Sequence, residues 1–175
     1  MPYHVIARDF AGGEDALRER SGRIVRALIE LGITDAVGVP DNVTRIIFNL
    51  LDAEPDLQVV PVCREGEAWA IASGLWVGGR CPMVIIQNTG FFESGDGLRG
   101  TAIEMGVPLL VLMDYRGHHT LNKPNTDSAA TFFEPTLRAW GLPYRFLDNG
   151  EEAPILGAAF EQAQRTRRPV AVLMT

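Results

Sequence analysis

Uninterrupted apolar runs alternate along the chain with segments whose apolar residues recur at helical spacing. The runs predict strands at residues 33–39, 57–62, 82–87, 107–113, 144–147 and 169–174. Helices are predicted at residues 14–31, between Asp41 or Asn42 and Pro55, and at 68–78, 95–105, 129–140 and 151–165. Strands that are apolar at every position are buried on both faces. The pattern therefore predicts an α/β fold of three αβα layers, with about six strands in a mainly parallel sheet and helices on both faces.

The stretch from Val62 to Leu98 joins two of these strands to residues that carry chemistry. The strand at 57–62 is followed by the carboxylate of Glu65 and by a helix rich in Ala, Ser and Gly. The strand at 82–87 leads into QNTG at 87–90, which we expect to be a polar loop. In a parallel sheet, the ligand crevice lies beyond the carboxyl ends of the strands. Glu65 and this loop are therefore expected at one edge, as a candidate site.

Composition excludes several classes of protein. The chain has 175 residues, which is the size of one domain, and a net charge of −6, which argues against a nucleic-acid surface. No apolar run approaches the roughly 18 residues that span a bilayer, and the start lacks the pattern of a signal peptide. We therefore expect no membrane contact and a cytoplasmic location. Cys63 and Cys81 are expected to be small buried hydrophobes, without the spacing of a zinc site.

Each candidate residue also has a simpler interpretation. Glu65 could do no more than interact with the dipole of the helix that follows it, and 87–90 could be ordinary turn chemistry. His118 and His119 lie in a long polar segment, 114–128, at the same expected edge. They could relay protons, because the pKa of histidine is close to neutral, or they could be an exposed pair without a task.

Three passages taken together resemble the pyrimidine-binding (Pyr) domain of thiamine-diphosphate-dependent decarboxylases. They are GVPDN at 38–42, REGEAWAIASG at 64–74 and QNTG at 87–90, and GLPY at 141–144 also fits. The pattern is most similar to the alpha subunit of sulfopyruvate decarboxylase and to the N-terminal part of phosphonopyruvate decarboxylase. The resemblance runs from about residue 20 to the end and implies that residues 1–175 form a single Pyr domain.

The resemblance also implies roles for individual residues. Glu65 would contact the aminopyrimidine of thiamine diphosphate and activate the cofactor for decarboxylation of a small 2-oxo acid. The catalytic candidates are Glu65, His118 and His119. The candidates for binding the cofactor are Glu65, Pro40, Asn88, Thr89 and Gly90. The candidates for the substrate pocket are Asp41, Asn42, Gln87, Phe91 and Phe92.

The chain departs from the family pattern after QNTG. The family continues Leu-Gly-Asn-Ser, whereas this chain has Phe91-Phe92-Glu93-Ser94, and only Arg116-Gly117 remains of a later Arg-Gly-Glu passage. HHTL at 118–121 is similar to the paired-histidine passage of pyruvate-type decarboxylases. These differences favour an uncharged or weakly polar 2-oxo acid. We also expect Phe91 and Phe92 to form an exposed loop tip that, with the small-residue helix, promotes self-association.

The resemblance leaves half of an active site unaccounted for. Gly95-Asp96-Gly97 followed by Asn122 imitates the family's diphosphate and magnesium signature, but neither part comes at the end of a predicted strand, so we interpret Asp96 as a first-turn helix residue. The diphosphate-binding (PP) domain and its Mg²⁺ are therefore expected on a partner, the beta subunit of a hetero-oligomer that shares the cofactor. Two alternatives remain. The chain could be a catalytically silent partner of a PP-domain protein, or a flavodoxin-like binding module.

Overall fold

The computed structural model describes residues 13–175 and contains a single six-stranded sheet in the order β2-β1-β3-β4-β6-β5. Every neighbouring pair of strands is parallel. The strands are β1 (Asp35–Gly38), β2 (Gln58–Pro61), β3 (Pro82–Gln87), β4 (Leu110–Asp114), β5 (Tyr144–Phe146) and β6 (Val170–Met174). The predicted parallel α/β fold is confirmed.

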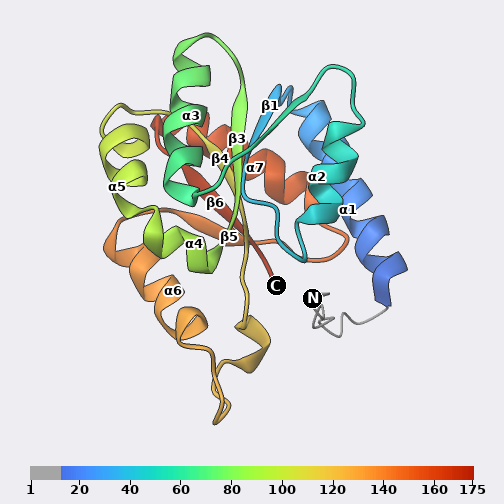
Figure 1. Cartoon of the computed structure of the whole chain (residues 1–175), viewed down its shortest axis with the longest axis vertical. Helices are drawn as coiled ribbons and strands as arrows, with labels where there is room; N and C mark the ends of the chain where they lie inside the picture. The colour runs from blue at the N-terminus through green and yellow to red at the C-terminus, as the bar shows by residue number, and fades with distance from the viewer. Residues whose placement is uncertain (1–12) are drawn as a thin grey trace.

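Helices cover both faces of the sheet, which gives the expected three layers (Figure 1). One face carries α1 (Gly13–Glu30), α2 (Arg45–Asp52) and α7 (Glu152–Thr166). The other face carries α3 (Glu65–Val77), α4 (Asn88–Glu93), α5 (Gly95–Gly97), the π-helix η1 (Leu98–Ile103) and α6 (Ser128–Ala139). A 3-10 turn, η2 (His118–Thr120), interrupts the segment between β4 and α6.

The burial of the strands explains why they appear in the sequence as uninterrupted apolar runs. Strands β1, β4 and β6 are buried at every position, and β3 at every position except its last residue. Only the edge strands β2 and β5 are partly exposed. Strand β1 lies so close to β3 that a Cβ atom on Gly38 would stand 1.8 Å from the carbonyl oxygen of Ile85. Glycine is therefore required at this position, at the end of the strand that leads to the candidate site.

The structure corrects the expected polar loop at 87–90. Helix α4 begins at Asn88, directly after β3, so Asn88, Thr89 and Gly90 form its first turn. Phe91 and Phe92 do not form a loop tip. The ring of Phe91 is fully buried, 5.4 Å from the Phe133 ring and 5.2 Å from the Trp140 ring between centroids. The prediction failed because burial of Phe91 depends on α6, which is remote in sequence.

The helix expected at 95–105 is also different in detail. It consists of the short α5 and the π-helix η1, and Gly106 ends it with a positive φ of 69°. Ser94 does not cap it through its side chain. Its hydroxyl instead accepts a hydrogen bond from the buried indole N–H of Trp69 in α3, at 2.8 Å, and donates to the carbonyl oxygen of Phe91. Asp96 is a residue of α5, as expected, and pairs with Arg99 on the surface.

Two features are absent from residues 13–175. No helix in that range is long and apolar enough to cross a bilayer. Within the same range, no three His, Cys, Asp or Glu side chains are grouped in a way that could hold a metal ion. The expected burial of both cysteines is wrong for Cys63, which is exposed, whereas Cys81 is partly buried.

Candidate active site

The candidate site lies where the direction of strand order reverses. From β1 the chain passes to β2 on one side and then returns to β3 on the other, from which β4 and β6 continue outward. In open parallel sheets, ligands bind beyond the carboxyl ends of the strands at such a switch point. The residues at or beyond the carboxyl ends of β1, β2 and β3 are therefore the ones best placed to form a site, and they include Asp41, Glu65 and Gln87.

Glu65 is the first residue of α3, and its side chain lies against the first turn of α4. A Cβ atom built on Gly90 would stand 2.0 Å from the Glu65 carboxyl carbon and 2.2 Å from its Cγ. The absence of a side chain on Gly90 therefore makes room for the Glu65 carboxyl group. The two residues are 25 positions apart in sequence, and the structure brings them together.

Gln87, the last residue of β3, ties three strand ends together. Its amide nitrogen donates to a carboxylate oxygen of Asp41 at 3.1 Å and to one of Asp114 at 3.3 Å. Its amide oxygen accepts a hydrogen bond from the Thr89 hydroxyl at 2.6 Å. The other oxygen of Asp41 accepts hydrogen bonds from the backbone N–H groups of Val43 and Thr44. Asp41 therefore also fixes the turn that precedes α2. The expected substrate residues Asp41 and Gln87 thus belong to one hydrogen-bonded group.

Asn88 is fully buried and has one unused polar atom. Its amide nitrogen donates to the carbonyl oxygen of Arg116, in the segment after β4, at 3.0 Å. Among residues 13–175, its amide oxygen is buried and has no hydrogen-bond partner. Buried acceptors are normally satisfied, so this oxygen could accept a hydrogen bond from a bound group.

The two histidines have different environments. The ring of His118 is half-buried and packs between Tyr115 and Phe146, with centroid distances of 4.9 and 5.6 Å. His119 is exposed. Burial, together with the nearby Glu134 carboxylate, raises the pKa of Tyr115 to about 12, so the phenol stays protonated and donates to the carbonyl oxygen of Ala130.

The remaining expected site residues are at the same edge or close to it. Pro40 and Asn42 are exposed in the connection between β1 and α2. Phe92 is partly exposed on α4, whereas Phe91 points into the core. The assignment of Phe91 and Phe92 to a substrate pocket stays a prediction.

Two residues of this region were not singled out for the site by sequence reasoning. Asp114 is buried at the end of β4 and bonded to Gln87, and its signal was a charged residue closing an apolar run. Glu93, at the end of α4, accepts hydrogen bonds from Arg64 and from the backbone N–H of Gly66. The Gly66 N–H, with Arg64, lowers the pKa of Glu93. Nothing in the local sequence indicated that Glu93 meets the start of α3.

Comparison with known proteins bears on the family resemblance independently of the geometry of the site. No protein-family model matches the chain. The alpha subunit of sulfopyruvate decarboxylase from Methanococcus maripaludis is 24% identical over 155 residues, which cover 88% of this chain and 93% of that subunit. The corresponding subunit from Methanothermobacter thermautotrophicus is 26% identical over 157 residues, covering 89% of this chain and 95% of that subunit. The chain is similar over most of its length to alpha subunits of sulfopyruvate decarboxylase.

A further relative shares only part of its length with the chain. The phosphonopyruvate decarboxylase of Streptomyces viridochromogenes is 32% identical over 94 residues, covering 54% of this chain and 24% of that protein. The sulfopyruvate decarboxylase alpha subunits, by contrast, are matched over almost their whole length. The resemblance deduced from GVPDN, REGEAWAIASG and QNTG is therefore confirmed.

Proposed function

We propose that the chain is the Pyr-domain subunit of a two-subunit, thiamine-diphosphate-dependent 2-oxo acid decarboxylase, and that Glu65 is the group that activates the cofactor. The observation that carries this proposal is the placement of the Glu65 carboxyl group against Gly90 at the switch point of the sheet. The relationship to the sulfopyruvate decarboxylase alpha subunits supports a decarboxylase subunit.

The residues present fit the aminopyrimidine end of the cofactor. Such a ring carries nitrogen atoms that can exchange a proton with a carboxyl group, and an amino group that can donate hydrogen bonds. Glu65 offers the carboxyl group, and the unpartnered amide oxygen of Asn88 offers a buried acceptor. Thiamine diphosphate, when bound, supplies the electron sink that allows a 2-oxo acid to lose carbon dioxide.

The roles of the chain's own residues follow from these positions. Glu65 holds and moves the proton at the ring nitrogen N1′, and Gly90 leaves the space in which its carboxyl group sits. Gln87 holds Asp41 and Thr89 in fixed orientations at this edge of the sheet, where they orient the substrate. His118 and His119 remain candidates for proton transfer from the segment after β4.

The proposal requires a partner subunit, which would contribute the PP domain, the diphosphate site and Mg²⁺. The relatives' designation as alpha subunits supports this requirement.

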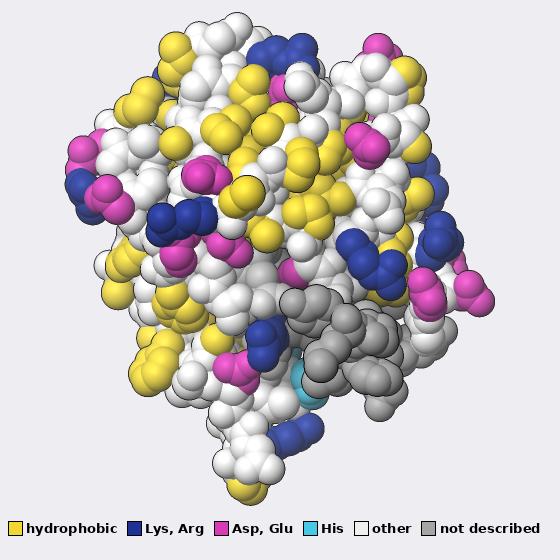
Figure 2. Space-filling view, viewed as in Figure 1, with side chains coloured by type: hydrophobic (Ala, Val, Ile, Leu, Met, Phe, Trp, Pro, Cys, Tyr) yellow, Lys and Arg dark blue, Asp and Glu magenta, His cyan; other side chains and the backbone are white. Residues whose placement is uncertain are grey.

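Helix α3 offers a surface for association, because it carries an exposed apolar stripe formed by Ala70, Ile71, Gly74 and Val77. Ile71 is 39% exposed and Val77 64% exposed. Figure 2 shows hydrophobic side chains gathered around this part of the surface. We accordingly interpret the chain as one Pyr domain that also self-associates within a hetero-oligomer.

Glu65→Gln tests the proposal in the complex reconstituted with the PP-domain subunit. Loss of the exchangeable proton is expected to lower kcat by roughly 100-fold or more. Glu67→Gln is the matched control, because it removes a carboxylate two residues away and keeps an acceptor for the backbone N–H groups of Cys63 and Arg64. Activity of Glu65→Gln within twofold of the native complex would support the silent-partner alternative instead. A flavin chromophore in the purified chain would support the flavodoxin-like module.

A further inference from the structure

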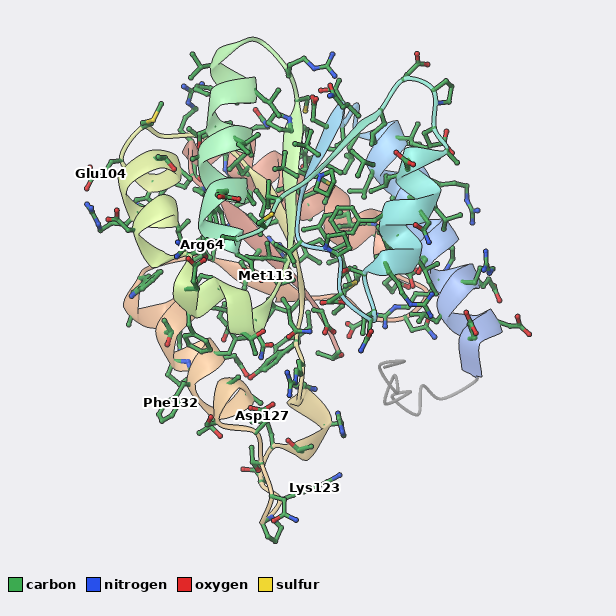
Figure 3. All side chains as sticks on the ribbon, in the orientation of Figure 1. Arg64, Glu104, Met113, Lys123, Asp127 and Phe132 are labelled. Atoms are coloured by element: carbon green, nitrogen blue, oxygen red, sulfur yellow. The ribbon has the colours of Figure 1, made fainter. Side chains whose placement is uncertain are left out.

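The carboxylate of Glu93 lies across the start of α3, next to Glu65. One of its oxygens accepts a hydrogen bond from Nε of Arg64 at 2.9 Å, and the same oxygen pairs with the terminal guanidinium nitrogen Nη2. Its other oxygen accepts from the backbone N–H of Gly66 at 3.1 Å. Glu93 therefore binds both residues that flank Glu65 in sequence. Figure 3 shows Arg64 at the junction where the start of α3 meets α4.

The same short helix also contacts the Glu65 side chain. Gly90 and Glu93 are three residues apart, so they lie on neighbouring turns of one face of α4. Gly90 faces the Glu65 carboxyl group, and Glu93 holds the backbone on either side of it. A third link, from the Trp69 indole to Ser94, joins α3 to the end of α4 one turn farther along. Helix α4 thus contacts both the backbone on either side of Glu65 and the carboxyl group at the end of its side chain.

A role in stability alone does not account well for this arrangement. The side chain of Arg64 is 69% exposed and that of Glu93 is 35% exposed, and ion pairs at such exposure contribute little because solvent screens them. The backbone hydrogen bond is different, because it is directional and involves one of the N-terminal N–H groups that a helix cannot satisfy internally. The specific consequence of losing it would be a start of α3 that is free to shift.

We propose that Glu93 is a positioning residue, which clamps Arg64 and Gly66 so that the carboxyl group of Glu65 stays against Gly90. This inference rests on the proposed catalytic function of Glu65. The inference assigns a role to a residue at which the chain departs from the family pattern, because Glu93 occupies the position where that pattern has Asn.

The first test uses the chain alone and measures amide hydrogen exchange at Gly66. Glu93→Ala removes the acceptor and is expected to speed exchange of this amide by roughly tenfold, which corresponds to the loss of one hydrogen bond. Glu93→Gln keeps an oxygen in place and should leave exchange close to that of the native chain. Asp96→Ala is the matched control, because it removes a nearby carboxylate that is 91% exposed and pairs with Arg99 instead of with Arg64 or Gly66. Unchanged exchange in Glu93→Ala would overturn the proposal.

The second test uses the complex reconstituted with the PP-domain subunit. A displaced Glu65 is expected to lower kcat by about 10- to 100-fold in Glu93→Ala, since small misplacements of catalytic groups have effects of this size. KM for the 2-oxo acid should stay within about twofold, because Glu65 faces the cofactor and not the substrate. Glu93→Gln should recover most of the rate. Arg64→Ala provides a second variant, which breaks only the guanidinium side of the clamp and should have a smaller effect.

The possible outcomes separate this inference from the function on which it rests. If Glu65→Gln is inactive while Glu93→Ala keeps a native kcat, the inference about Glu93 is wrong and the proposed function stands. If Glu65→Gln retains activity, the proposed function is wrong and the inference fails with it. A loss of rate in Glu93→Ala that Glu93→Gln does not relieve would also contradict positioning through the backbone hydrogen bond.

Discussion

The contact between Glu65 and Gly90 can be tested by adding a single carbon atom. In Gly90→Ala, the new Cβ would lie 2.0 Å from the Glu65 carboxyl carbon, whereas ordinary contacts begin at 3.4 Å. The carboxyl group would therefore have to move by about 1.4 Å. The atoms that must move belong to the end of a flexible side chain, so the fold should accommodate the change. Alanine also favours a helix over glycine by about 0.5–1 kcal/mol, which offsets part of any strain.

We expect Gly90→Ala to unfold at a urea concentration close to that of the native chain, while kcat of the reconstituted complex falls by about 100-fold. This combination separates displacement of a catalytic group from general destabilisation. Gly157→Ala in α7 is the matched control, because its Cβ would meet no atom of residues 13–175 within 4 Å. Its kcat should stay native, while the free energy of unfolding should rise by about 0.5–1 kcal/mol, the ordinary gain from alanine in a helix. Full activity in Gly90→Ala would refute the placement of Glu65 as the activating group. A large loss of stability would refute the argument that the side chain can yield.

Two further predictions concern stability. Ser94→Ala leaves the buried indole N–H of Trp69 without its partner and should cost about 1–3 kcal/mol in urea unfolding; a cost near zero would show that the hydrogen bond is unimportant. Glu152 is buried, which opposes ionisation, but hydrogen bonds from Arg23 and from the backbone N–H of Gly150 prevail and lower its pKa below the ordinary 4.5. The resulting stabilisation is present above pH 4.5 and is lost as the pH falls through the lower pKa of the folded state. The free energies of unfolding of the native chain and of Glu152→Gln, measured in urea, should therefore converge in acid after differing by about 2 kcal/mol near neutral pH. A difference that stays constant with pH would contradict this assignment.

Most helices and strands could be predicted from local sequence patterns, because the two kinds of element differ in hydrophobic period. Strand β3 was predicted at its observed bounds, since its apolar run is bounded by Cys81-Pro82 on one side and by Gln87 on the other. The helices predicted to end at residues 31 and 140 end in the structure at Glu30 and Ala139, and Gly32 and Gly141, which follow them, both have positive φ. The predictions were wrong where an element is short or its hydrophobic period is mixed, as in α4 and in the π-helix η1.

The sequence by itself determined that Glu65 and Gln87 stand at the carboxyl ends of parallel strands, because apolar runs define strands and parallel strands end at one edge. Only the tertiary structure decided what those residues touch. The seating of Glu65 against Gly90, the clamp of Glu93 on the start of α3 and the bond from Gln87 to Asp114 all depend on how helices and strands distant in sequence cross. Periodicity fixes which face of an element is buried, but the partner that covers this face is chosen when the layers pack.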